Sequence, residues 1–153
     1  MRLWRLTRAP FVALDGAGPE QHGARYTSLG RPVVNFASEP GLAVLVALRY
    51  LPRDLAGIDE DYVLGWTDVD ATAERVPVEQ DDDVTRQLVD NWLDSRRSLL
   101  AAVSSKVLPE ADIVMMNPLH PDAAGVKPLV TRPFSFSECL HTPPMLERYG
   151  NRK

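Results

Sequence analysis

The sequence predicts a single domain of the α+β class, with mixed or antiparallel strands and a few helices. The candidate strands are short apolar runs separated by turns, and two helical segments interrupt them without the regular alternation of a doubly wound sheet. The 153 residues suit one domain with one core, and no linker or internal repeat divides them, so we expect one domain over residues 1–153. Thirteen prolines and nine glycines favour short elements joined by stiff turns.

Three predicted strands lie in the first half of the chain. Each is a short apolar run next to turn residues, with a loop expected at 14–19 and a turn at 28–32. The expected strands span residues 3–6, 32–37 and 62–66.

A helix is predicted between the second and third of these strands. Ser38 can cap it, Glu39 favours the positive end of the helix dipole, and Pro40 suits the first turn. Residues 41–51 are apolar on nearly every side, so we expect this helix to be buried, and Pro52 ends it.

A second helix is predicted over residues 83–96. Val84, Leu88 and Trp92 recur every four residues and mark its apolar face. The aspartates at 81–83 can bind a cation, but an exposed helix N-terminus favoured by the dipole is the preferred interpretation.

The second half of the chain contains the remaining predicted strands. We expect them at residues 99–103, 113–116 and 126–130, with a last short strand at 134–136. The tail, residues 148–153, is expected to be mobile.

The charge of the chain argues against nucleic-acid binding. The net charge is -4 and the isoelectric point is about 5.3, whereas a nucleic-acid binder needs a basic face. Two small basic clusters, Arg2 with Arg5 and Arg8, and Arg96 with Arg97, suit an anion the size of a nucleotide better than a duplex.

The single cysteine, Cys139, predicts a reducing compartment, and we expect the protein to be cytoplasmic. No stretch approaches the ~20 apolar residues of a membrane span, and the N-terminus lacks the apolar run of a secretory signal. The histidines His22, His120 and His141 show no metal-ligand spacing, so no metal site is expected.

The segment 23–34 carries the clearest chemical signal. Phosphate-binding glycine loops and the serine nucleophile motif are absent from the sequence. Instead, Arg25 and Tyr26 precede a turn and an apolar strand; such an arginine can bind a phosphate, and the ring can stack on a base or nicotinamide. A solvent-reaching arginine beside a half-buried tyrosine explains the same pattern.

The order of motifs along the chain resembles the RES domain family. Members have a strand with an arginine, a glycine-rich loop, G-G-R-W-N-x-x-G, an apolar strand and a buried helix. V-P-S, L-N-P-x-H-P-D and P-F-x-F follow. The similar segments here are residues 4–6 (WRL), 14–18 (LDGAG), 23–27 (GARYT), 38–43 (SEPGLA), 103–105 (VSS), 116–122 (MNPLHPD) and 132–136 (RPFSF).

The resemblance implies an ADP-ribosyltransferase-like fold with a cleft for NAD+, and a toxin of a type II toxin–antitoxin system that cleaves NAD+. It places the three residues that name the family at Arg25, position 46 and Ser105, and a second NAD+-binding arginine at Arg5. Tyr26 is expected to line the nicotinamide side, and Ser105 to contact the ribose or the amide; a turn residue is the alternative for Ser105.

The chain departs from the family at Val46, where the family has glutamate, and at Ala24, Tyr26 and Thr27. Glu39 is seven residues before Val46 on the same helix face, but about 10 Å away along the axis, which is far for a substitute. Two functions therefore stay open: transfer of ADP-ribose to a protein, phosphate or water, and a weakened module that only binds a nucleotide or a partner. The resemblance also implies an Xre-type antitoxin that occludes the cleft.

Overall fold

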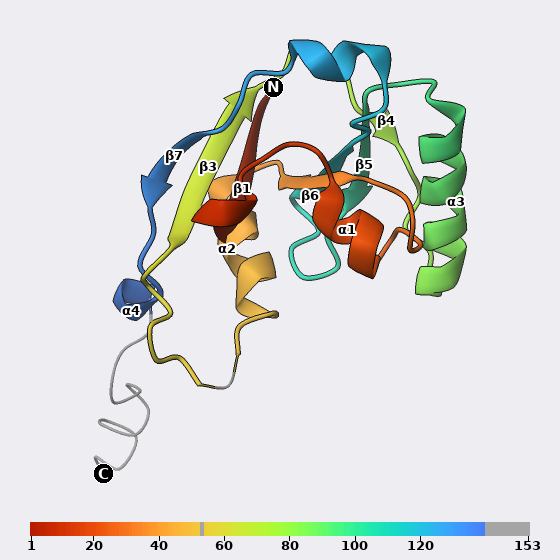
Figure 1. The fold of residues 1–153 in the computed structure, drawn as a ribbon. Helices are drawn as coiled ribbons and strands as arrows, with labels where there is room; N and C mark the ends of the chain where they lie inside the picture. Colours follow the sequence, from red (N-terminus) through yellow and green to blue (C-terminus); the bar gives the residue numbers. More distant parts are fainter. Residues whose placement is uncertain (53, 140–153) are drawn as a thin grey trace.

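The chain folds around one seven-stranded sheet, as seen in a computed structural model that describes residues 1–52 and 54–139 (Figure 1). The strand order is β4-β5-β6-β2-β1-β3-β7, and every neighbouring pair is antiparallel except β4 with β5. The strands are β1 (Arg2–Arg8), β2 (Val34–Ala37), β3 (Tyr62–Asp68), β4 (Glu74–Arg75), β5 (Leu100–Ser104), β6 (Asp112–Met116) and β7 (Val130–Pro133). The helices are α1 (Ala17–His22), α2 (Pro40–Leu48), α3 (Asp82–Ser95) and α4 (Phe136–Cys139), with short 3₁₀ turns at Ala9–Phe11 and Pro121–Gly125. The predicted α+β class is confirmed.

The sheet is nearly divided between β1 and β2. All seven residues of β1 pair with β3, whereas β1 meets β2 only at Trp4 and Ala37. On the other side, β2 pairs along its whole length with β6. Figure 1 shows the result: β1, β3 and β7 form one half, and β5, β6 and β4 lie in the other. The divergence leaves room for a cavity between the halves.

Strands β5 and β6, in the half of the sheet beside α3, pack into the core on both faces. In β5, Leu100 and Ala102 pack into one cluster with Val114 and Met116 of β6, while the alternate residues pack on the opposite face against α3. This is the period of two expected for a strand. The cluster on the α3 side contains Tyr26, Val33, Val76, Val89, Trp92, Leu93, Ala101, Val103 and Met115.

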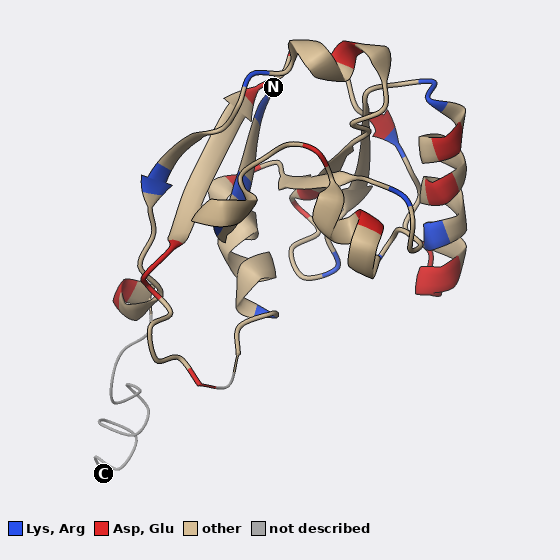
Figure 2. Cartoon of the chain, viewed as in Figure 1, with Lys and Arg blue, Asp and Glu red and all other residues tan. Residues whose placement is uncertain are grey.

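Helix α3 forms as predicted, but its buried face is not the predicted one. Trp92 is fully buried, whereas Val84 and Leu88 are 43% and 37% exposed. The buried row runs through Thr85, Val89 and Trp92, so Val84 and Leu88 lie at its edge. The spacing of the apolar residues predicted the helix correctly. The buried face, however, is centred one residue later than the predicted one. Acidic residues lie in the first turn of α3 and again in its second half, with a basic residue between them (Figure 2).

Helix α2 begins differently from the prediction. Glu39 occupies the N-cap without a side-chain cap, and Pro40 is the first helical residue. Ser38 is not the cap, because its Oγ accepts a hydrogen bond of 2.9 Å from the backbone N–H of Asp112, the first residue of β6. Ser38 thus joins the start of α2 to the sheet.

Helix α2 is also less buried and shorter than predicted, ending at Leu48. Only Leu42 and Ala43 are buried, and Leu45 is 37% exposed. Its apolar composition predicted full burial. Instead, one side of the helix packs on the sheet and another side borders a cavity.

Several shorter predictions were wrong. Helix α1 occupies part of the expected loop at 14–19, and the two-residue β4 was not predicted. Residues 126–129 are not a strand, because β7 begins only at Val130. The segment 134–136 is not a strand either. Phe136 begins α4 and is fully buried, with its ring edge-on to Tyr62 at 4.9 Å.

One prediction concerns residues that the structure does not describe. The tail at 148–153 lies outside the described residues. Among the residues that are described, no helix is long and apolar enough to cross a membrane.

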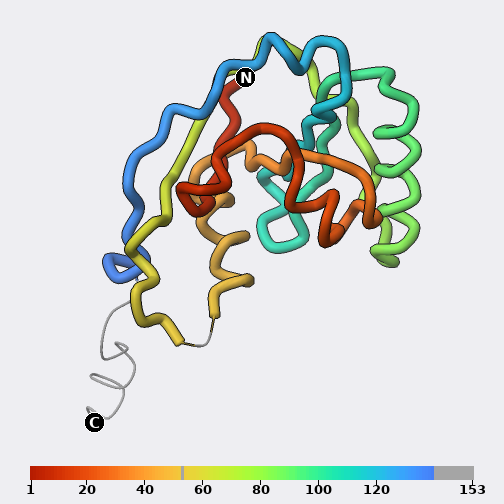
Figure 3. Tube along the Cα trace, viewed as in Figure 1, coloured from red at the N-terminus to blue at the C-terminus, as the bar shows by residue number. Residues whose placement is uncertain are grey.

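The long connection from β1 to β2 reaches toward α3 and returns to the sheet (Figure 3). One hydrogen bond and one ion pair hold the connection against α3. The hydroxyl of Ser28 donates to the carboxylate of Asp90, and Arg31 pairs with Asp94 at 3.0 Å. Gly16 makes the bend possible, since its φ is +71° and a Cβ would lie 2.5 Å from the backbone nitrogen of Val33. The connection therefore forms a fixed wall beside the divided sheet.

Candidate functional site

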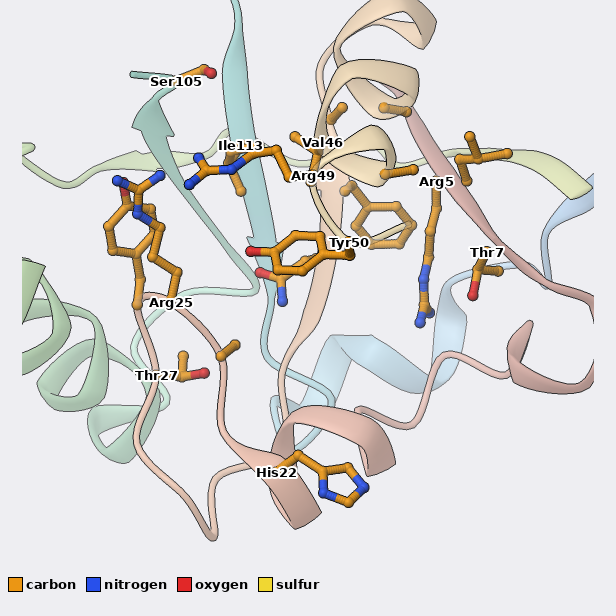
Figure 4. Close-up of a pocket in the computed structure, with 18 of the residues that line it drawn as sticks. Arg5, Thr7, His22, Arg25, Thr27, Val46, Arg49, Tyr50, Ser105 and Ile113 are labelled. Carbon is orange, nitrogen blue, oxygen red and sulfur yellow. The ribbon is translucent and has the colours of Figure 1, made fainter. Parts of the chain in front are cut away.

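A cavity of about 1020 Å³ opens between the two halves of the sheet (Figure 4). Its walls come from β1, the connection at 22–29, β2, the α2 helix and the turn after β5. The cavity joins segments far apart in the sequence, as expected for a ligand site of this size.

The cavity is lined by cations without carboxylates. No aspartate or glutamate is among its lining residues within the described part of the chain, although acidic residues outnumber basic ones in the whole sequence, 21 to 17. Such a site favours an anionic ligand. The lining cations are Arg5, Arg8, Arg25, Arg49, Arg86 and Lys106.

Arg25 is held in place from three directions. Its Nε donates to the carboxylate of Asp82 at 3.0 Å, and its guanidinium lies 5.3 Å from the centre of the Tyr26 ring. Arg86 donates to the backbone oxygen of Arg25 at 3.0 Å. Since only the Nε of Arg25 contacts Asp82, its terminal nitrogens remain available to a ligand. The predicted pair of Arg25 and Tyr26 therefore lies in the cavity wall.

Asp82 also binds Lys106, at 2.7 Å, and so joins two cations of the wall. Lys106 first and Arg25 second hold the pKa of Asp82 below its usual range. Its neighbours are similarly engaged: Asp81 accepts from the backbone N–H of Asp83, and Asp83 pairs with Arg86. The aspartate run thus serves the helix start and the arginines, and no metal-binding group of three His, Cys, Asp or Glu side chains occurs in the described ranges.

Arg5 lies across the cavity from Arg25, on β1 (Figure 4). Its guanidinium makes one long hydrogen bond, 3.4 Å, to the backbone oxygen of Ala13. Burial lowers the pKa of Arg5, and the charge of Asp15 opposes this shift. Among the described residues, no carboxylate lies within 4.0 Å of its guanidinium. Arg5 is therefore a partly desolvated cation with no described carboxylate in direct contact.

The other predicted basic clusters do not belong to this site as a group. Arg2 pairs with Asp68 at 2.9 Å, and neither Arg96 nor Arg97 lines the cavity. Arg97 pairs with Glu74 at 2.6 Å beside β4. Arg2 and Arg97 therefore form separate surface ion pairs away from the cavity.

Val46 lines the cavity from α2 and also packs against the core cluster below the helix. Ala43, Ala47 and Tyr50 line the cavity at helical spacing around it. Position 46 thus faces the space where the resemblance places a carboxylate. Glu39, the weak candidate to replace it, does not line the cavity.

Ser105 is buried at the far end of the cavity, directly after β5. Its Oγ accepts hydrogen bonds of 3.2 Å from the backbone N–H groups of both Val107 and Leu108. Ser105 therefore stabilises the turn after β5, as the alternative prediction for this residue expected. It does not exclude ligand contact, because the hydroxyl proton remains able to donate.

Two lining residues, Thr27 and Arg49, were not assigned to the site from the sequence, and Thr27 was named only as a departure from the family motif. Thr27 is 2% exposed, and its Oγ1 is the one buried side-chain polar atom without a hydrogen-bond partner in the described structure. Arg49 follows the last residue of α2. Only a prediction of which helix face borders the cavity could have identified Arg49. His22 also lines the cavity, at the end of α1.

A sheet that diverges between β1 and β2, with a cation-lined cavity between its halves, defines a small α+β protein whose cavity suits an anionic ligand. The chain belongs to the RES domain family: the family model matches residues 2–137. The resemblance drawn from the ordered motifs is thereby confirmed.

The chain is similar along most of its length to proteins that are named as toxins. It is 34% identical over 126 residues to the "Prs ADP-ribosylating toxin" of Sphingobium sp. (strain YBL2), covering 74% of this chain and 78% of that protein. It is 30% identical over 134 residues to "Toxin Res" of Pseudomonas putida, covering 83% of this chain and 91% of that protein. "Toxin Res" of Photorhabdus laumondii is 29% identical over 132 residues, with 80% and 85% covered.

The fold is similar to a chain in the crystal structure of the M. tuberculosis MbcT–MbcA toxin–antitoxin complex. The TM-score is 0.64, and the match covers 86% of this chain and 83% of that chain. At 17% identity, this similarity shows the shared fold alone.

Proposed function

We propose that this chain is the toxin of a toxin–antitoxin system, that it acts in the cytoplasm, and that it cleaves NAD+ and transfers the ADP-ribose to an acceptor. The observation that carries the proposal is the cavity with Arg5 on one side, Arg25 and Tyr26 on the other, and no carboxylate among its described lining residues. The relatives that bear toxin names support the same activity.

The chemistry of NAD+ accounts for the residue types. The pyrophosphate carries two negative charges, and arginine forks match the geometry of its oxygens. The aromatic ring of Tyr26 offers a surface on which the nicotinamide can stack. Ser105 can donate its remaining proton to a ribose hydroxyl or to the amide oxygen. These roles are assigned to Arg5, Arg25, Tyr26 and Ser105 as proposals.

In the proposed reaction the bond between the ribose C1′ and the nicotinamide nitrogen breaks, and its electron pair leaves with the neutral nicotinamide. The ribose becomes oxocarbenium-like, as in glycoside hydrolysis. The acceptor then forms the new bond to C1′ and loses its proton to solvent. In most such sites a carboxylate stabilises the cation and helps to activate the acceptor. Val46 can do neither.

The missing carboxylate bears on the choice of acceptor. Water and phosphate need activation within the cavity, whereas a protein acceptor brings its own nucleophile and neighbouring groups. We therefore propose slow transfer to a protein over rapid release to water or phosphate. The relative named for ADP-ribosylation of Prs supports a protein acceptor.

Incubation of the purified chain with adenine-labelled NAD+ and a cell lysate tests this proposal. Release of nicotinamide together with label on a particular protein supports it. Rapid turnover that depends on added phosphate, without labelled protein, would show that the acceptor is phosphate. Intact NAD+ that nonetheless binds the protein would favour the second candidate, a binding module, for which the departure at Val46 is the specific support.

The partner we propose is an Xre-type antitoxin that occludes the cavity. The similar fold found in a toxin–antitoxin complex supports an antitoxin as partner. Occlusion requires competition, so saturating NAD+ should raise the apparent Kd of the antitoxin by linkage. Simultaneous binding of both with unchanged affinities would argue against occlusion.

A further inference from the structure

Arg49 is placed to reach into the cavity from the end of α2. Its backbone N–H donates to the carbonyls of Val46 and Ala47, so the residue continues the last turn of the helix. Its side chain lines the cavity. In Figure 4 the guanidinium of Arg49 extends toward that of Arg25, which comes from the opposite wall. Two cations from opposite walls of the cavity therefore face one another.

The two arginines differ in how their charges are balanced. Arg25 is bound by Asp82 through Nε alone. The side chain of Arg49 makes no hydrogen bond or ion pair with any described residue, whereas Arg8 pairs with Asp61 and Lys106 with Asp82. Facing like charges repel, and a bound anion between them converts the repulsion to attraction.

We infer that Arg49 binds the pyrophosphate of NAD+ together with Arg25, which makes it a further substrate-binding residue. This inference rests on the proposed function. A diphosphate has oxygens on opposite sides and two charges, so it can accept from two guanidinium groups that approach from opposite walls. Arg49 is three residues beyond Val46. The α2 segment therefore contributes a cation to the cavity but, with valine at position 46, no carboxylate. Its contribution is to the binding of substrate rather than to bond cleavage.

Calorimetry with two ligands tests this role. ADP-ribose contains the pyrophosphate, and adenosine lacks it. Arg49→Ala should weaken ADP-ribose on the order of tenfold, the loss expected for one charge-assisted contact, and leave adenosine unchanged. With NAD+ as substrate, Arg49→Ala should raise KM and leave kcat unchanged. Arg49→Gln serves as a second variant, and Arg96→Ala removes an arginine that does not line the cavity.

The outcomes separate the inference from the function beneath it. If the wild-type protein binds neither ADP-ribose nor NAD+, the proposed function fails. If the wild type binds ADP-ribose, but Arg49→Ala and Arg49→Gln both weaken it less than about threefold, the role of Arg49 is overturned while the function stands. Equal weakening of ADP-ribose and adenosine would also overturn it, because the effect would then not concern the phosphates.

Discussion

The two walls of the cavity differ in how their cations are held. On the paired wall, which comprises Arg25, Tyr26 and Lys106, a ring lies beside the arginine, and Asp82 binds both cations without itself lining the cavity. On the open wall, which comprises Arg5, Val46 and Arg49, the cations have no carboxylate partner among the described residues. The paired wall is therefore arranged before a ligand binds, while the open wall gains its anion only from the ligand.

Val46→Glu changes the open wall most. Position 46 faces the cavity, so the new carboxylate can reach solvent, the ribose or Arg25, and the fold should survive with a stability loss of about 1 to 2 kcal/mol. NAD+ cleavage should rise on the order of a hundredfold, the range typical of a positioned catalytic group. Nicotinamide release and a thermal melt measure the two effects.

Leu45→Glu is the matched control, because it adds the same charge to an exposed position of α2 that does not line the cavity. Val46→Gln separates charge from shape. A large fall in Tm with no gain in cleavage for Val46→Glu would mean that the side chain faces the core, and that the correspondence of this position with the family glutamate is wrong.

Arg5→Ala and Arg25→Ala compare the walls directly. Each substitution should weaken the binding of NAD+ by about 1.5 to 3 kcal/mol, because each removes a charge-assisted contact to phosphate. Their effects on stability should differ. Arg25→Ala removes the contacts with Asp82 and Tyr26 and should lower Tm, whereas Arg5→Ala relieves a desolvated cation and should not.

Calorimetry and thermal melts on both variants check this pair of effects. Unchanged NAD+ affinity in both would remove these arginines from the site. Equal losses of Tm would show that the two walls are held in the same way, contrary to the comparison.

Asp82→Asn tests the paired wall through pH. The pKa of Asp82 is held below its usual range by Lys106 and Arg25, so its ion pairs stabilise the folded protein above the unfolded pKa, about 4. This stabilisation is lost as the pH falls through the folded pKa. The Tm of Asp82→Asn should therefore lie below that of the wild type at pH 7, and the difference should shrink below about pH 4. A difference that persists undiminished at pH 2 would exclude the carboxylate charge as its cause.

The smallest predicted effect concerns Thr27. Its buried Oγ1 has no partner in the described structure, so Thr27→Val removes an unsatisfied polar atom at nearly constant volume. Stability should rise by about 1 kcal/mol, with NAD+ affinity unchanged. Chemical denaturation measures the first and calorimetry the second. Weaker NAD+ binding by the variant would instead indicate that this hydroxyl contacts the ligand.

The sequence predicted the elements of the fold better than their environment. Helix α2 was placed almost correctly, but its apolar composition could not distinguish a core face from a cavity face. In α3, Val84 and Leu88 carried the helical period, yet the buried row passes through Thr85, whose hydroxyl accepts from the backbone N–H of Glu79. A polar residue with a local hydrogen bond gives no hydrophobic signal.

The motifs predicted several residues that line the cavity, but not the contacts that hold its walls. Arg5, Arg25, Tyr26, Val46 and Ser105 were assigned from motif order, and the structure brings all five to one cavity. The ion pairs that hold the paired wall depend on side chains 57 and 24 positions apart, and no local pattern links such positions. Arg49 lay within the predicted helix at 41–51, but the sequence predicted full burial of that helix and so did not indicate that Arg49 borders a cavity.

An NMR titration with ADP-ribose tests the central claim most directly, because this ligand retains the pyrophosphate and cannot lose nicotinamide. The account predicts shifts of the amide signals of Arg5, Arg25 and Ser105, from three separate segments around the cavity, while Arg97 at the β4 edge stays unchanged. Saturable shifts confined to residues outside the cavity, or no shifts at millimolar ligand, would contradict the assignment of this cavity as the NAD+ site.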